Sequence, residues 1–321
     1  MSLLLAAAAV LCLFSSCSEE ADGDPLTVNG TPISDEIFRF YLDEGFGDDS
    51  LWDKSDIVNY ATEQCIRYVA VNSAFEARGL SLSAGEIADL SERGNALWRY
   101  FGAHYEKIGV SKQTFMKIQT SLAYTESLRY ALFDKGGVMP LGDDMLKSYL
   151  SEKYASFKAL SGNLFGTDVY GNRTELTNEQ AMNIMDRYDT AANQINIGGS
   201  IEYVYASLVN SGNDEVRQSL ETVVILDGNP FYPEGFYSFV KEIEPGKAQA
   251  MIFDDKIYLV YRVDILSDPD IFEKYRNACL IAVSEPYLQS EINVMCNAYT
   301  SVRRSFAVER CYNSVKEGRN S

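Results

Sequence analysis

The hydrophobic positions of the chain fall into three zones that differ in spacing. In the first zone, about residues 26–138, apolar side chains recur every three or four positions, which is the period of an amphipathic helix. Gly79 is of the residue type that commonly follows a helix C-terminus, so the longest of these stripes is expected to end there. The residues of this longest stripe that are predicted to face the core are Ile57, Ala61, Cys65, Tyr68, Val71 and Phe75.

The same zone begins with a short strand. Leu26–Val28 alternates, Asn29-Gly30 predicts a turn, and Ser34 is a suitable cap for the helix that follows. Further helices are predicted at about 83–100 and 111–133. The expected inward residues of the latter are Phe115, Ile118, Leu122 and Leu132.

The middle zone, about residues 150–266, mixes strands with helices. Thr177-x-x-Gln180 is a capping-box signature, and Met182, Met185, Ala192 and Ile195 are the expected inward face of the helix that it opens. The order β-α-α-β-α-β predicts a small α+β domain. The predicted elements are a strand at 156–165, a helix from Thr177 to Gly198, a short helix from Ser200, a strand at 220–226, a helix within 233–243 and a hairpin over 250–263 with Asp254-Asp255 as its turn.

The third zone, residues 267–321, is predicted to be mainly helical. Pro269 suits the first turn of one helix, Pro286 is expected to start a second, and residues 306–310 to form a short strand. These helices are expected to fold back on the first zone, whose apolar stripes it cannot bury alone. The predicted fold is therefore α+β: a helical domain at 26–145, completed by residues 267–321, with an α+β domain inserted at 150–266.

The first residues have the hydrophobic pattern of an export signal. Residues 3–14 form an apolar run that is too short to span about 30 Å of hydrocarbon but matches the core of a secretory signal peptide. The following Leu13-Phe14-Ser15-Ser16-Cys17 resembles the lipobox of bacterial lipoproteins, although Phe14 and the lack of Lys or Arg before the run depart from that pattern. The resemblance implies a signal peptide at 1–16, lipidation of Cys17, a tether at 17–25 and an extracytoplasmic position on a bacterial membrane. A cleaved signal peptide without lipid and an uncleaved anchor are the alternatives.

Charge narrows the class of partner. The chain carries 46 acidic and 28 basic residues, a net charge of -18. Nucleic acid is therefore not an expected partner, because phosphate binding relies on clustered Lys and Arg. The acidic surface also disfavours adsorption to anionic lipid, so contact with the membrane is expected through the lipid anchor.

Cysteine and histidine usage limits the chemistry. Four cysteines lie beyond the leader, Cys65, Cys279, Cys296 and Cys311, and they permit two disulfides in three pairings or remain as buried free thiols. A bridge from Cys65 to Cys279 or Cys296 would follow from the expected folding back. The cysteine spacing does not fit a zinc site, and His104 is the only histidine and is expected on a helix surface. No metal and no cofactor is predicted.

Three stretches resemble parts of known folding factors. "LTVNGTPISDEIFRFYL" resembles the opening of the SurA/PrsA group of exported folding factors. "GGSIEYVYASL" and "EGFYSFVKEIEPGKAQAMIFDDKIYLVYRVDI" resemble parts of a parvulin-type peptidyl-prolyl isomerase domain. The resemblance covers nearly the whole chain beyond the leader. It implies a chaperone or foldase whose partners are unfolded or newly exported polypeptides.

The sequence departs from the parvulin pattern at the active site. Parvulins carry a histidine in the first strand and another in the last, where this chain has Leu160 or Ser161 and Lys256. No catalytic residue is therefore assigned, and little or no isomerase activity is expected. Tyr232, Phe236 and Tyr237 are candidates to line a peptide groove, although Phe236 also suits a core position.

Three functions follow in order of preference. The first is a lipid-anchored extracytoplasmic chaperone for unfolded polypeptides. The second is an active prolyl isomerase that works without the family's histidines. The third is a solute-binding lipoprotein, which is disfavoured because no repeated βαβ rhythm is visible in the chain.

Overall fold

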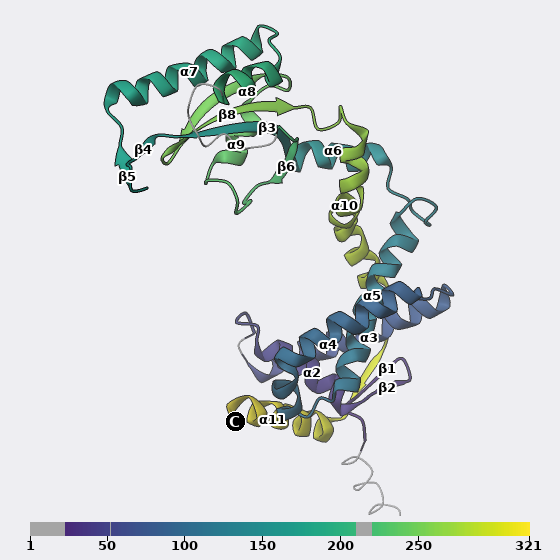
Figure 1. Ribbon diagram of the computed structural model, residues 1–321. Coiled ribbons are helices and arrows are strands. Elements are labelled where there is room, and N and C mark those ends of the chain that lie inside the picture. Colours follow the sequence, from purple (N-terminus) through teal and green to yellow (C-terminus); the bar gives the residue numbers. More distant parts are fainter. Residues whose placement is uncertain (1–22, 52, 210–219) are drawn as a thin grey trace, which may run out of the picture. The chain divides into compact units, whose positions relative to one another are not determined.

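The computed structural model describes residues 23–51, 53–209 and 220–321 (Figure 1). The chain forms two compact units, one made of Met1–Pro140 with Ser284–Ser321 and the other of Leu141–Val283. The predicted α+β fold is confirmed: C-terminal residues complete a helical unit, and an α+β unit is inserted into its sequence.

The helical unit begins with a small sheet that joins the two ends of its sequence. β1 (Leu26–Val28) pairs antiparallel with β2 (Thr31–Ile33) on one side and with β9 (Ser301–Arg303) on the other. Leu26 lies opposite Arg303 in this register. The C-terminal segment is thus held to the first strand by main-chain hydrogen bonds.

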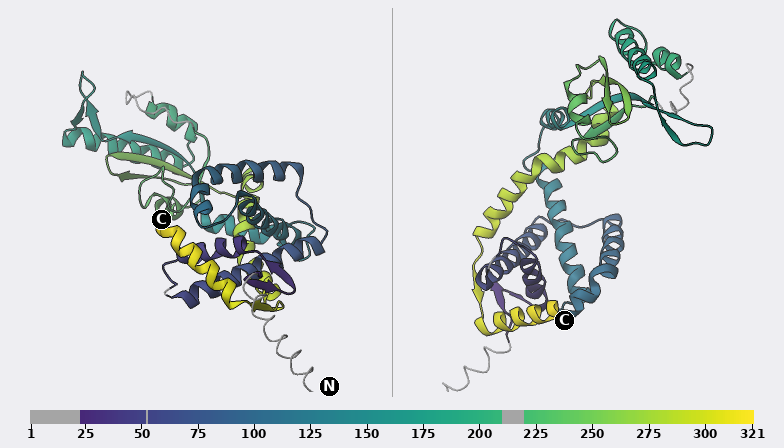
Figure 2. Two further views of the ribbon diagram at one scale, coloured as in Figure 1. Left: turned by 90° about the horizontal axis from the view of Figure 1, so that it is seen from below. Right: turned by 90° about the vertical axis from the view of Figure 1, so that its left-hand side faces the viewer.

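Five helices among the described residues form the body of this unit, and all but the last of them begin with a side-chain cap. They are α2 (Asp35–Phe46), α3 (Lys54–Ala77), α4 (Ala84–Lys107), α5 (Lys112–Phe133) and α11 (Ser305–Asn320). As predicted, the Ser34 side chain accepts a hydrogen bond from the Ile37 amide and caps α2. Gly79 follows α3 with a φ of 64°, a left-handed conformation that glycine adopts without a steric penalty. α11 packs against α2 (Figure 2).

The core of the helical unit is continuous from the small sheet to α11. Leu26, Phe38, Cys65, Ile118 and Cys311 all contribute to one buried cluster and are at most 2 % exposed. Leu122, predicted to face this core, is instead 57 % exposed. Ile118 and Ser121, which lie three positions apart, are buried instead and define the helix face that α5 buries.

Two predictions for the third zone are wrong. α10 (Pro269–Asn297) continues through Pro286, because the fully buried Leu280, Leu288 and Ile292 keep helical spacing on both sides of the proline. Residues 306–310 belong to α11 rather than to a strand, since Ala307, Cys311 and Val315 recur at steps of four and are all fully buried. The strand of this region is β9.

The second unit is a four-stranded antiparallel sheet with helices on both faces. α6 (Asp143–Lys153) leads into β3 (Tyr154–Asn163), and the sheet order is β6-β3-β8-β7. The remaining elements are β4 (Phe165–Thr167), β5 (Arg173–Glu175), α7 (Asn178–Asn196), α8 (Ile201–Val209), β6 (Val223–Leu226), α9 (Phe236–Glu242), β7 (Ala248–Phe253) and β8 (Lys256–Val263).

Alternation along the two central strands divides the sheet into two faces. Leu160 and Leu259 point to the face covered by α7 and α8, whereas Phe157 and Val260 point to the face covered by α9 (Figure 1). The Thr177–Gln180 capping box at the start of α7 is present as predicted. Met182, predicted inward, is 61 % exposed.

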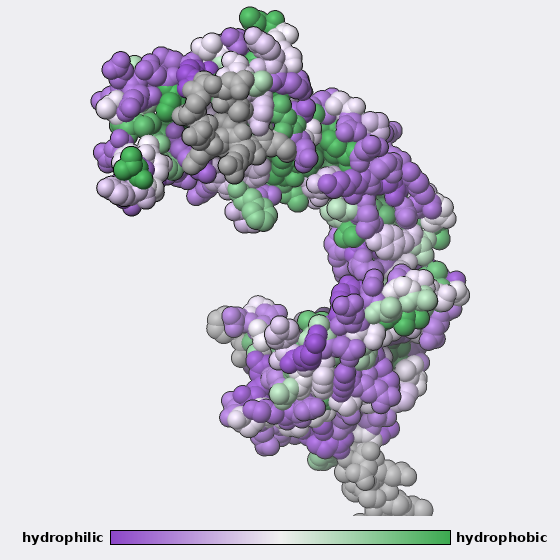
Figure 3. Space-filling view, in the orientation of Figure 1, coloured by the Kyte–Doolittle hydropathy of each residue, from purple (hydrophilic) through white to green (hydrophobic). Residues whose placement is uncertain are grey.

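α6 and the β4–β5 hairpin were not predicted from the sequence. Each strand of the hairpin has three residues, and β5 is exposed along its whole length, so it has no hydrophobic alternation to detect. In the view of Figure 3 hydrophilic residues cover most of the surface of both units, as the net charge of -18 suggests. No helix in the described part of the chain is long and apolar enough to cross a membrane.

Candidate functional site

The positions matched to the parvulin histidines lie on the two central strands but do not face each other. Ser161 of β3 lies opposite Tyr258 of β8, and Lys256 lies opposite Asn163. Ser161 is 6 % exposed. Residues 150–266 contain neither histidine nor cysteine. These two positions therefore supply no proton-exchanging pair of the kind that general acid–base chemistry uses.

Aromatic side chains fill the face of the sheet beneath α9. Tyr232 stacks on Phe236 with ring centroids 4.6 Å apart, and Phe157 and Tyr258 approach Phe236 edge-on at 5.4 and 5.2 Å. Phe236 is fully buried, which makes it a core residue. The sequence anticipated the aromatic character of this face but not its closure into a packed cluster.

The three groove candidates therefore have different environments. Phe236 lies inside the cluster, and Tyr232 is half-buried at its border. The Tyr237 hydroxyl donates to the main-chain carbonyl of Lys153 at 3.1 Å, which ties α9 to the end of α6. Burial raises the pKa of both Tyr232 and Tyr237, so these phenols stay protonated at neutral pH.

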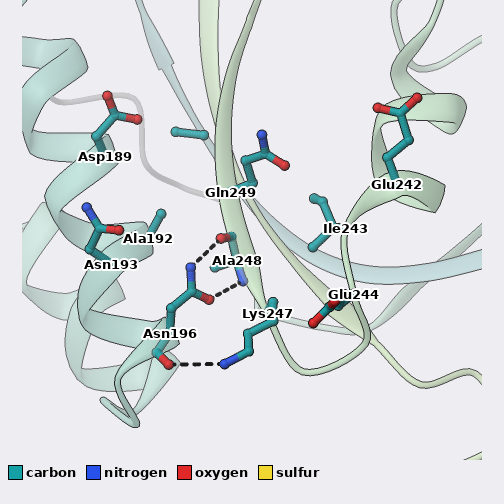
Figure 4. Close-up of a pocket in the computed structure, with 11 residues that line it drawn as sticks. Asp189, Ala192, Asn193, Asn196, Glu242, Ile243, Glu244, Lys247, Ala248 and Gln249 are labelled. Atoms are coloured by element: carbon teal, nitrogen blue, oxygen red, sulfur yellow. Dashed lines mark hydrogen bonds between the residues drawn. The ribbon is translucent and has the colours of Figure 1, made fainter.

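The edge strand β7 offers a different kind of site. The Asn196 side chain at the end of α7 pairs with Ala248 through two hydrogen bonds of 2.8 Å, one to its carbonyl and one from its amide (Figure 4). The N–H and C=O groups of Ala248 therefore point away from β8. Because this direction repeats every second residue of an antiparallel strand, the main-chain groups of Ala250 and Ile252 also point outward from the sheet.

Within residues 23–51, 53–209 and 220–321, a side chain bonds to the outward main-chain groups of β7 only at its first position, where Asn196 pairs with Ala248. Ala250 and Ile252 follow it on the strand's open side, and the side chains of Met251 and Ile252 are 41 and 36 % exposed. An edge strand with outward N–H and C=O groups is a template for pairing with another extended chain. No pattern in the sequence marks β7 as the edge, because edge position is a property of the assembled sheet.

A cavity of about 570 Å³ adjoins the start of this edge (Figure 4). It lies between α7 and the segment that joins α9 to β7. Three carboxylates line it, from Asp189, Glu242 and Glu244, and the Lys247 ammonium donates to the Asn196 carbonyl at 3.2 Å. The site can therefore hold polar and extended material, and its local charge is net acidic.

His104 is a structural residue of the helical unit. Its Nε2 lies 2.8 Å from Oδ2 of the buried Asp43, whose Oδ1 accepts a hydrogen bond of 2.6 Å from Arg319. The prediction of a helix-surface position is correct for exposure, since the side chain is 40 % exposed. The link to α2 was missed, because nothing in the local sequence connects His104 with a residue 61 positions away.

All four described cysteines are free. The expected bridge from Cys65 to Cys279 or Cys296 is therefore absent. Cys65 instead lies in the same core cluster as Cys311. Burial raises the pKa of the Cys65 thiol well above its usual range and that of Cys311 to about 12, so both remain protonated. Cys17, the predicted lipidation site, lies outside the described residues.

Neither a family model nor a curated protein matches the chain. Among solved structures, the chain is similar to the foldase protein PrsA from Lactococcus lactis, with 11% identity and a TM-score of 0.37 over 91% of this chain and 99% of that one. PrsA from Streptococcus pneumoniae gives 11% identity and 0.33 over 73% and 81%. A SurA-like chaperone structure from Campylobacter jejuni gives 10% identity and 0.32 over 88% and 99%.

Proposed function

We propose that this protein is an extracytoplasmic chaperone that holds unfolded or newly exported polypeptides and has little or no prolyl isomerase activity. The observation that carries the proposal is the open edge of β7 at Ala250 and Ile252. Main-chain hydrogen bonds do not depend on the identity of the side chains, so such an edge can accept extended segments of many unrelated sequences.

The surroundings of the edge suit this role. The exposed Met251 and Ile252 can make apolar contacts with client segments that become buried once the client has folded. The high net negative charge keeps the complex soluble while the client is unfolded. The sequence resemblance to the opening of SurA/PrsA proteins points to the same class of client.

Weak or absent isomerase activity follows from the chemistry of the α9 face. A prolyl isomerase lowers a barrier of about 18–20 kcal/mol by stabilising a twisted amide in a shaped pocket. Here Phe157, Phe236 and Tyr258 pack against one another on that face, and the positions matched to the family's histidines carry Ser161 and Lys256.

The membrane position belongs to the same proposal. The lipobox-like Leu13–Cys17 supports lipidation of Cys17, with residues 18–25 as a tether between the membrane and the folded body. The alternative of a cleaved signal peptide without lipid places the protein on the same side of the membrane, and so leaves the chaperone role unchanged.

Aggregation of chemically unfolded client proteins tests the proposal. The chain from residue 18 onward should slow light scattering of several unrelated clients at near-equimolar ratio. A protease-coupled assay on an Ala-Pro peptide, run in parallel, should give a rate near the uncatalysed one. Absence of any effect on all clients contradicts the chaperone role, and catalysis well above background contradicts the weak-isomerase part.

A further inference from the structure

A second hollow lies within the helical unit, among α2, α3 and α5. Its volume is about 240 Å³, and its walls carry Tyr41 and Glu44 from α2, Tyr60 and Tyr68 from α3, and Ile118 from α5. The lining also includes Val71, Leu122, Arg67 and neutral polar side chains, and Glu44 is the one carboxylate among the described lining residues. The space is large enough for a single long side chain.

The Glu44 carboxylate is the chemically distinctive group of this pocket. It makes neither an ion pair nor a side-chain hydrogen bond within residues 23–51, 53–209 and 220–321. Glu44 is an exposed residue that faces solvent on the open side of the pocket, and the surrounding protein desolvates its carboxylate only in part. This desolvation and the charge of the neighbouring Asp43 raise the pKa of Glu44 to about 7.

The other charged groups near Glu44 are already engaged or neutral. Arg67 also lines the pocket, but it donates to Gln289 at 2.8 Å. Asp43 is held by His104 and Arg319. Burial raises the pKa of Tyr41, Tyr60 and Tyr105, and the negative charge of the nearby Glu44 raises it further, so these phenols stay protonated.

We propose that this pocket binds the ammonium or guanidinium group of a lysine or arginine side chain on an unfolded polypeptide. The aliphatic stem would lie against Ile118 and the tyrosine rings, and the cation would approach the Glu44 carboxylate. Tyrosine faces attract cations, and a desolvated carboxylate forms stronger hydrogen bonds to charged donors than an exposed one. That the side chain belongs to a client polypeptide rests on the proposed chaperone function.

The chemistry of the site disfavours other occupants. An anion would be repelled by the Glu44 carboxylate, and the Arg67 guanidinium, the one cationic side chain among the described lining residues, donates to Gln289. A purely apolar side chain would leave the carboxylate desolvated and unpaired. A bound cation instead stabilises the charged form of Glu44 and lowers its pKa, so binding releases a proton near neutral pH.

Paired peptides test the inference directly. Two labelled peptides that differ only in one position, lysine or norleucine, are titrated with the protein at pH 8 and at pH 6 and followed by fluorescence anisotropy. The lysine peptide should bind about tenfold more tightly at pH 8, and this preference should shrink at pH 6 as Glu44 becomes protonated. Cadaverine should compete weakly, because it carries the cation without the flanking main chain.

Two variants locate the effect. Glu44→Gln keeps the shape of the side chain and should abolish the lysine preference. Glu63→Gln removes the same charge from an exposed position of α3 and should leave the preference intact. Equal binding of the two peptides by the unmodified protein, or an unchanged preference in Glu44→Gln, overturns the inference.

The outcome is separable from the chaperone role. If the protein suppresses aggregation but binds both peptides equally, the pocket assignment fails and the chaperone proposal stands. If lysine-specific binding occurs without suppression of aggregation, the chaperone proposal fails and the pocket's chemistry stands. Stronger binding of cadaverine than of the lysine peptide contradicts a polypeptide as the ligand.

Discussion

At the residue scale, two neighbouring carboxylates of α2 show how environment decides what a side chain does. Asp43 is buried and satisfied by His104 and Arg319, so it joins α2 to α4 and α11. Glu44 lies one residue further on, at a pocket where no described side chain pairs with its carboxylate, and its pKa is raised to about 7. One stabilises the helical unit, and the other weakens it whenever it is charged.

Glu44→Gln should stabilise the protein in a pH-dependent way. The pKa of Glu44 is higher in the folded state than its usual 4.5, so the folded state binds more protons between pH 4.5 and about 7, and stability falls as pH rises through that window. Glutamine cannot ionise, so the Glu44→Gln protein does not lose this stability as the pH rises. Urea denaturation should therefore show a larger gain over the unmodified protein at pH 8 than at pH 5, and an equal difference at both pH values would contradict the assignment.

Asp43→Asn should have the opposite effect at neutral pH. The amide keeps the size of the side chain but weakens the hydrogen bonds with His104 and Arg319 inside a buried site, at a cost of about 1–3 kcal/mol. The urea midpoint at pH 7 reports this loss. Asp49→Asn, in an exposed position, is the control and should leave the midpoint unchanged. The interpretation would be refuted by equal midpoints for the Asp43 variant and the unmodified protein.

At the element scale, the sequence predicts what local spacing encodes and misses what only assembly creates. The Ser34 cap, the Thr177–Gln180 capping box and the stripe of α3 are local signals, and all three are present. The continuation of α10 through Pro286 depends on partners buried on both sides of the proline, which no local rule supplies. Both candidate sites are also products of assembly, since the β7 edge and the Glu44 pocket exist only after strands and helices have packed.

Ala250→Pro tests the role of the β7 edge. The Ala250 amide points away from β8, and proline at such an edge position removes an outward donor without breaking the sheet's own pairing. Suppression of client aggregation should fall severalfold while the circular dichroism spectrum is preserved. Glu221→Pro, an exposed position before β6, should keep full activity. Unchanged suppression in a folded Ala250→Pro protein would exclude the edge as the holding site.

At the scale of the whole molecule, the folded body and the leader are expected to contribute independently. The two units carry their own cores, and residues 1–22 lie outside the described structure. An acyl chain anchors a protein by burying hydrocarbon in the bilayer, about 0.8 kcal/mol per methylene, and this energy does not support the fold. Removal of the anchor is therefore expected to leave client binding by the folded body unchanged.

Cys17→Ala should move the protein out of the membrane fraction or leave it as an uncleaved precursor. Its helical content and thermal stability should match those of the unmodified protein, and labelling with a radioactive fatty acid should disappear. A Cys17→Ala protein that is cleaved yet remains in the membrane fraction would show that another surface attaches it.

The central claim is that extended clients pair with the open edge of β7, and amide hydrogen exchange measures this pairing directly. Across the edge, no described residue bonds to the amides of Ala250 and Ile252, so in the free protein these amides should exchange rapidly. Addition of an unfolded client should slow both severalfold, while those of Gln249 and Met251, directed toward β8, change little. A client that binds and resists aggregation while the exchange of Ala250 and Ile252 stays unchanged would contradict the account.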